Sequence, residues 1–109
     1  MRIWDISPGK LCRNHLLGEH RELHAIWSIL IHQKKGYAHH PETLRWRGKL
    51  KALYLRHEAL VQEMKRRGYH HQSPLTIKEA TGDDRQDILI DSYEEQVRLL
   101  RQKNCGCTV

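Results

Sequence analysis

Residues 12–31, CRNHLLGEHRELHAIWSILI, decide the fold of this chain. Their apolar side chains recur at helical spacing and therefore share one face of an α-helix. That face consists of Cys12, Leu16, Leu23, Ile26, Trp27, Leu30 and Ile31. Ser7-Pro8 supplies a capping hydroxyl and a proline at the first helical position. Gly36, which follows two lysines, is typical of a helix end. We predict a first helix that begins at Ser7-Pro8 and ends before Gly36.

A second helix is predicted from Pro41 to Gly68. Its apolar seam alternates spacings of four and three and consists of Trp46, Leu50, Leu53, His57, Leu60 and Met64. Because His57 lies inside this seam, we interpret it as a hydrogen-bonded core histidine rather than a catalytic one. Gly48 is unfavourable inside a helix and indicates close approach of another backbone segment.

A third helix is predicted from Ser92 to about Lys103, because Ser92 and Glu95 form a capping-box pattern. Tyr93, Val97 and Leu100 are expected to face inward, and the apolar run 88–90 is expected to pack under the core. The sequence therefore predicts an all-α fold, with residues 1–109 forming a single compact domain. This domain has three main helices joined by long irregular connections.

The composition favours a polyanionic partner. Lys and Arg number 19 against 13 Asp and Glu, a net charge of +6, and such a surplus attracts nucleic acid or anionic lipid. No apolar run approaches the ~18 residues that span a membrane, and the first residues do not resemble a signal peptide. We expect a cytoplasmic protein without a membrane partner.

The possible metal ligands do not form a familiar pattern. Cys105 and Cys107 are closer together than the usual Cys-x-x-Cys pair, and His20 and His24, one helical turn apart, have no third ligand nearby in the sequence. We predict neither a metal nor another cofactor. A metal site that combines these two pairs is the weaker alternative.

One edge of the first helix carries polar residues. His15 and Glu22 are seven residues apart and lie within about 20° of each other on the helix. Glu19 lies between this edge and the apolar stripe, whereas Arg21 points away from the stripe. Partly desolvated carboxylates beside an imidazole are typical of a functional cleft. The alternative, equally compatible with the periodicity, is a solvated edge with Glu19 paired to an arginine.

Cations alternate with other residues at the start of the second helix, in Arg45-Trp46-Arg47-Gly48-Lys49. Side chains of this density can neutralise several phosphates. The same pattern also fits an ordinary solvated helix face. We name Arg45, Arg47 and Lys49 as candidate DNA-binding residues.

Residues 14–23, NHLLGEHREL, resemble the pyrimidine dimer DNA glycosylase family, the phage-type endonuclease V proteins. His15, Glu19, Arg21 and Glu22 all match the family pattern. A second similar stretch runs from Lys49 to His71 and includes Arg67-Gly68-Tyr69. The resemblance covers most of residues 1–71.

This resemblance implies a DNA glycosylase with abasic-site lyase activity that acts on pyrimidine dimers or a related base lesion. It implies that the α-amine of Met1 attacks the sugar C1′ and forms a Schiff base, with Glu22 as the essential acid. Arg2, His15 and Arg21 match positions that contact DNA near the lesion, and Glu19 supports the site.

The chemistry of these groups agrees with such roles. An α-amine has an ordinary pKa of about 8, so part of it is neutral near pH 7 and able to act as a nucleophile. The expected partner is damaged double-stranded DNA, bound by a monomer that associates with the nucleoid. The main alternative is a non-catalytic basic helical module that binds DNA.

Overall fold

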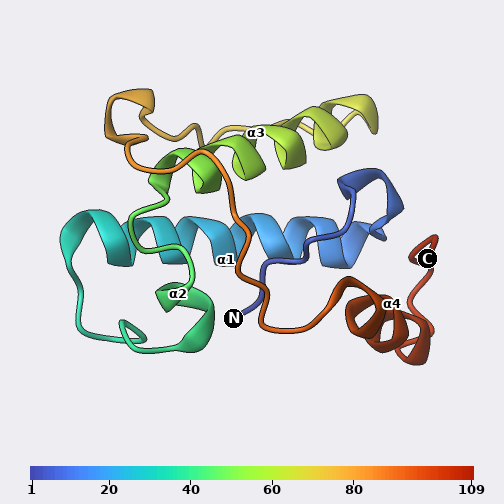
Figure 1. The fold of residues 1–109 in the computed structure, drawn as a ribbon. Helices are drawn as coiled ribbons and strands as arrows, with labels where there is room; N and C mark the ends of the chain where they lie inside the picture. The colour runs from blue at the N-terminus through green and yellow to red at the C-terminus, as the bar shows by residue number, and fades with distance from the viewer.

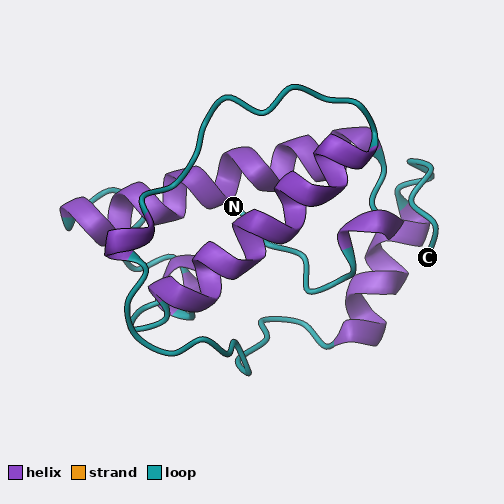
Figure 2. Ribbon diagram, turned by 90° about the horizontal axis from the view of Figure 1, so that it is seen from above, coloured by secondary structure: helices purple, strands orange, loops and turns teal.

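Helix α1 (Arg13–His32) runs through the middle of the molecule, and α3 (Leu50–Arg66) lies along one side of it (Figures 1 and 2). The computed structural model describes residues 1–109 and contains two further helices, α2 (Pro41–Leu44) and α4 (Tyr93–Gln102). Single 3₁₀ turns, η1 (Pro8–Lys10) and η2 (Ile77–Glu79), interrupt the connections. No strand is present, which confirms the all-α prediction.

The hydrophobic core lies between α1, α3 and the N-terminal segment. Its fully buried members include Leu16, Leu23 and Ile26 of α1 and Leu53 and Leu60 of α3. The extended residues ahead of α1 also belong to it: Ile3, Trp4, Ile6 and Leu11 are all buried. No helix combines the length and the apolar character that crossing a membrane requires.

The first helix begins later than predicted. Ser7-Pro8 opens only the short η1 turn, after which Leu11 and Cys12 adopt extended backbone conformations. Leu11 is buried in this extended conformation, whereas a continuous helix from Pro8 would have pointed its side chain in another direction. Helix α1 therefore starts at Arg13, and it ends at His32, ahead of Gln33, whose backbone is left-handed with φ 51°.

The predicted second helix is divided into α2 and α3. The break falls at Gly48, whose φ of 72° is incompatible with a right-handed helix. The Gly48 carbonyl accepts a hydrogen bond from the Asp83 amide at 2.9 Å, and a Cβ on Gly82 would lie 2.1 Å from that carbonyl oxygen. Close backbone approach at Gly48 is thus confirmed, but the uninterrupted helix is wrong.

The predicted seam of the second helix is nevertheless buried, except for Leu50, which is half-buried. Trp46, Leu53, His57, Leu60 and Met64 are at most 5% exposed. The segment 81–83 replaces the missing helical turn, because its Thr81 and Asp83 carbonyls accept the amides of Lys51 and Ala52. Segments distant in sequence therefore complete the start of α3.

The third predicted helix is present as α4, with the Ser92 hydroxyl accepting a hydrogen bond from the Glu95 amide. Leu100 is buried as expected, but Tyr93 is 40% exposed and Gln96 is buried in its stead. The expected burial of residues 88–90 is wrong, since their side chains are 42–50% exposed. Here the backbone faces inward: the Ile88 carbonyl accepts a hydrogen bond from Arg45.

Candidate functional site

The N-terminal segment is held against α1 and α4 by hydrogen bonds to charged and polar side chains. The Trp4 amide donates to Glu19 Oε1 at 3.0 Å, and the Asp5 amide donates to Gln96 Oε1 at 2.8 Å. Burial of Ile3 and Ile6 adds a hydrophobic anchor. The position of Met1 is therefore fixed by the residues that immediately follow it.

A cavity of about 390 Å³ opens between this segment, the first half of α1 and α4. It brings Met1 and Glu22 to one site, together with Arg2, His15 and Glu19. The remaining lining residues are Trp4, Asn14, Gly18, Leu99 and Lys103. Five of the predicted site residues are thus gathered around one recess.

Glu19 lies at the buried side of this cavity and is 2% exposed. Arg56 of α3 binds both of its carboxylate oxygens, with Nε 2.6 Å from Oε2 and Nη2 3.0 Å from Oε1. Burial raises the pKa of Glu19, and Arg56 and the Trp4 amide oppose that effect. Glu19 is therefore paired with an arginine, as one alternative predicted. It also lines a cavity, as the other alternative, a functional cleft, predicted.

Glu22 differs from Glu19 in its surroundings. It is half-buried, lines the same cavity and forms no salt bridge. Its carboxylate is therefore available to a group that enters the recess, whereas that of Glu19 is occupied by Arg56 and Trp4. The Glu22 carboxylate is thus suited to a chemical role and the Glu19 carboxylate to a structural one.

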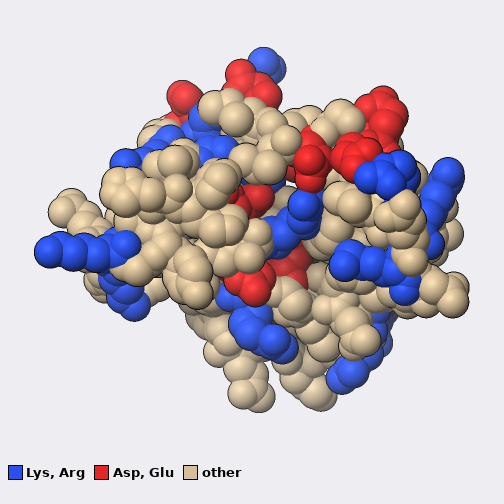
Figure 3. Space-filling view, turned by 90° about the horizontal axis from the view of Figure 1, so that it is seen from below, with Lys and Arg blue, Asp and Glu red and all other residues tan.

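Basic side chains accompany the acidic ones on this side of the molecule. Figure 3 shows acidic side chains in the hollowed centre of one face, with Lys and Arg side chains in and around it. Arg2 pairs with Asp91 at 2.9 Å and lies over the Trp4 ring, 4.7 Å from its centroid. Lys103 reaches the same cavity from the end of α4.

Comparison with protein families gives a match over residues 1–77 to the pyrimidine dimer DNA glycosylase family. The chain belongs to this family. The match covers more than half of the 109 residues and includes both Met1 and Glu22. Comparisons with curated proteins and with solved structures give no match. The resemblance inferred from residues 14–23 is confirmed, and the protein is a DNA glycosylase of the pyrimidine dimer type.

Not every predicted DNA-binding residue of this glycosylase is exposed. Arg45 is 3% exposed, and its guanidinium donates to Asp5, Glu42 and the carbonyls of Ile3 and Ile88. Such a guanidinium cannot reach a phosphate. The assignment of Arg45 to DNA binding is therefore corrected: it organises the interior between α2 and the N-terminal segment.

Lys49 and Arg47 lie in different environments although they are only two residues apart. Lys49 is 9% exposed, and its ammonium group binds Gln86 and Asp87. Arg47 is exposed and borders a second cavity of about 690 Å³, together with Lys34 and Lys35. Of the three cations named in this stretch, Arg47 alone has an exposed side chain suited to DNA.

His15 lies between the cavity and the side chains of two cysteines. It lines the cavity of Met1 and Glu22, yet its Nδ1 lies 3.1 Å from Cys12 Sγ and 3.4 Å from Cys107 Sγ. It forms no hydrogen bond with Glu19, whose carboxylate binds Arg56 and the Trp4 amide. Partial burial and the charge of Lys103 lower the pKa of His15, which favours a neutral ring at pH 7.

Five lining residues, Trp4 among them, were not predicted from the sequence. Asn14 and Gly18 precede Glu22 at intervals of four, so a wider reading of the helical wheel would have found them. Leu99 and Lys103 follow from the docking of α4. Nothing in the sequence near α1 indicates that contact.

A histidine cluster joins α1, α3 and the segment after α3. His20 Nε2 and His24 Nε2 lie 3.3 and 3.2 Å from Nε2 of buried His57, and His71 packs against the rings of His20 and His57. The core-histidine interpretation of His57 is confirmed, with Glu58 Oε1 3.0 Å from its Nδ1. These histidines are separate from the cysteines, so the weaker alternative of one metal site built from both pairs is wrong.

This cluster predicts a loss of stability in mild acid. Burial, together with the neighbouring His24, His57 and His71, lowers the pKa of His20 from 6.5 to about 4. The unfolded chain then binds more protons than the folded one, so the free energy of unfolding should fall as the pH drops from 6.5 towards 4. Thermal unfolding in the presence of a chelator measures this decrease.

The control is His20→Gln, which should reduce the slope of the profile in that window, and His24 and His57, whose pKa values burial also lowers, maintain the remainder. Glu63, whose pKa is lowered to about 2 by Arg66 and Arg67, contributes only below pH 4.5 and so does not interfere. A wild-type unfolding temperature that is constant between pH 6.5 and 4.5 would contradict the assignment.

Proposed function

We propose that this glycosylase also cleaves the resulting abasic site, with the α-amine of Met1 as nucleophile and Glu22 as acid and electrostatic stabiliser. The observation that supports this is that Met1 and Glu22 line the same cavity of about 390 Å³. The substrate is a cyclobutane pyrimidine dimer or a related base lesion in double-stranded DNA. We further propose that the protein acts as a monomer in the cytoplasm, associated with the nucleoid.

In the proposed reaction the neutral amine attacks the sugar C1′ of an extruded nucleotide. The C1′–N bond to the base breaks, and the base leaves with the bonding electrons and takes up a proton. Opening of the sugar ring gives an imine between Met1 and C1′. Loss of a C2′ proton then expels the 3′ phosphate by β-elimination, which cuts the strand.

Glu22 suits the charge changes of this sequence. The sugar becomes cationic as the base departs, and a carboxylate beside it stabilises the transition state more than the ground state. The same carboxylate is placed to move protons to and from the sugar ring. Glu19 is tied to Arg56 and instead holds the Trp4 amide, which positions the amine.

DNA binding is expected from exposed cations around the recess. Arg21 is exposed on α1, one residue before Glu22, and is not engaged in a salt bridge. Chemistry at C1′ requires the nucleotide to leave the duplex stack. A basic surface that grips the flanking phosphates supplies binding free energy for that distortion.

Arg21→Ala should weaken DNA binding and reduce the slope of log K against log salt by about one, the effect of one lost phosphate contact. Fluorescence anisotropy with a duplex at several salt concentrations measures both quantities. Lys78→Ala is the matched control, because Lys78 is exposed in η2 and does not line the cavity. An unchanged salt slope for Arg21→Ala would exclude the phosphate contact.

The mechanism is tested by borohydride trapping on abasic, UV-irradiated and intact duplexes. Reduction should leave a covalent protein–DNA adduct on the first two duplexes only, and peptide mapping should place the link on the Met1 amine. A variant whose N-terminus is blocked by an added peptide should bind DNA without forming the adduct. Binding without an adduct in the unblocked protein would favour the non-catalytic DNA-binding module.

A further inference from the structure

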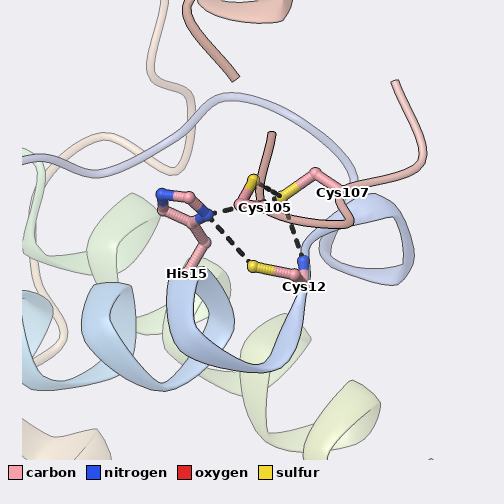
Figure 4. A group of neighbouring side chains, drawn as sticks. All are labelled: Cys12, His15, Cys105 and Cys107. Atoms are coloured by element: carbon pink, nitrogen blue, oxygen red, sulfur yellow. Dashed lines mark hydrogen bonds between the residues drawn. The ribbon is translucent and has the colours of Figure 1, made fainter. Parts of the chain in front are cut away.

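The residues after α4 return to the start of α1 and bring four side chains with ligating atoms together (Figure 4). Cys12 caps the N-terminus of α1, His15 lies in its first turn, and Cys105 and Cys107 come from the C-terminal segment. One ligating atom from each of the four lies within 4.8 Å of the others. Three thiols and one imidazole form a frequent structural zinc ligand set.

We propose that Cys12, His15, Cys105 and Cys107 bind a structural Zn²⁺ ion. This inference is independent of the proposed lyase reaction. Ordinary Zn–S and Zn–N bond lengths give a tetrahedron with edges of about 3.6–3.8 Å. The His15 Nδ1 distances to Cys12 Sγ and Cys107 Sγ are 3.1 and 3.4 Å, and the Cys105 and Cys107 sulfurs are 3.4 Å apart. These three distances reach tetrahedral values with outward shifts of a few tenths of an ångström, and the other three lie within 4.8 Å.

Hydrogen bonding alone explains this cluster poorly. A single Nδ1 atom faces two sulfur atoms, but it has only one proton or one lone pair to share. A disulfide does not explain it either, because the 3.4 Å between Cys105 Sγ and Cys107 Sγ is far above an S–S bond of about 2.05 Å. One metal ion satisfies all four groups at once.

The surroundings also suit a bound thiolate. The Cys12 amide donates a hydrogen bond to Cys107 Sγ at 3.1 Å, the kind of outer contact that orients a metal ligand. The Thr108 amide donates to the Lys10 carbonyl at 2.7 Å, which holds the C-terminal segment beside η1. The four ligands are all half-buried, between the solvent and the core.

With four protein ligands the ion has no open position, so it is structural rather than catalytic. Its effect is to fasten the C-terminal segment to the start of α1. Coordination through Nδ1 also fixes the ring of His15, which lines the cavity next to Glu22. Metal loading is therefore expected to order one wall of the cavity.

The test uses the full chain purified without a polyhistidine tag, reduced and then dialysed with Zn²⁺. Elemental mass spectrometry should find about one zinc ion per chain in the wild type and almost none in Cys107→Ser. Zn²⁺ should raise the unfolding temperature of the wild type but not of Cys107→Ser. The matched control is His20→Asn/His24→Asn, which removes imidazoles from the separate histidine cluster and should keep the zinc.

Cobalt substitution decides the question even if Cys107→Ser fails to fold. Co²⁺ bound to the wild type should show the intense near-ultraviolet charge-transfer bands of thiolate ligation and the visible bands of a tetrahedral site. A chain that binds no metal after loading would overturn the proposal. So would a cobalt spectrum without thiolate bands, or zinc that is lost from His20→Asn/His24→Asn but retained by Cys107→Ser.

Discussion

Glu22→Gln should lower the rate of strand cleavage by roughly 10²- to 10⁴-fold, the usual contribution of a general acid or base. The amide has the same size as the carboxylate, but it neither stabilises a cationic sugar nor exchanges a proton with it. Glu22 forms no salt bridge, so replacing it leaves no cationic side chain without its partner. Single-turnover cleavage of abasic and UV-irradiated duplexes gives the rate.

DNA affinity separates this role from a structural one. The dissociation constant of Glu22→Gln for the same duplex should change little, since in the proposed reaction the carboxylate acts on the sugar after binding. Glu94→Gln is the control, because Glu94 is exposed on α4 and lies outside the cavity. An equal loss of binding and cleavage in Glu22→Gln would instead mean that the carboxylate maintains the structure of the site.

Arg45→Met should reduce the free energy of unfolding by about 3–5 kcal/mol, the cost of removing one partner from a buried ion pair. The substitution keeps an unbranched chain but leaves Glu42, which is 4% exposed, without its guanidinium. It also leaves the Ile3 and Ile88 carbonyls without their donor. A loss of this size is a large share of the stability of a small domain. Urea unfolding at neutral pH measures it.

Arg47→Met is the matched control two residues away. Arg47 is exposed, and its Nη2 donates only to the Ala38 carbonyl at 3.2 Å. Its replacement should cost no more than about 0.5 kcal/mol. Equal destabilisation by the two variants would show that the buried hydrogen bonds of Arg45 contribute little to folding.

The sequence predicted the fold wherever the deciding contacts are local. The apolar periodicity of residues 12–31 found α1 and its buried face, and Ser92 with Glu95 found the start of α4. The division of the second helix was missed because its cause is remote: Gly82 and Asp83 approach Gly48 from more than thirty residues along the chain. Local propensity cannot reveal such a contact.

The same limit applies to the charged residues. Alternating cations look alike whether they face solvent or the interior, so Arg45 was grouped with Arg47 although only Arg45 is buried. The helical wheel placed His15 and Glu22 on one edge, and both line the cavity. The meeting of His15 with cysteines near the other end of the chain depends on tertiary structure alone.

The match to the glycosylase family ends at residue 77, but residues 78–109 complete the molecule. Thr81 and Asp83 provide the carbonyls that close the first turn of α3, Gln96 holds Asp5, and Leu99 forms part of the cavity wall. A chain cut at residue 77 would thus retain Met1 and Glu22, the proposed reactive groups, and lose the Gln96 contact to Asp5 and one wall of the cavity. During synthesis on the ribosome, the cavity around the proposed nucleophile can therefore close only after the segment that carries Leu99 and Lys103 has emerged.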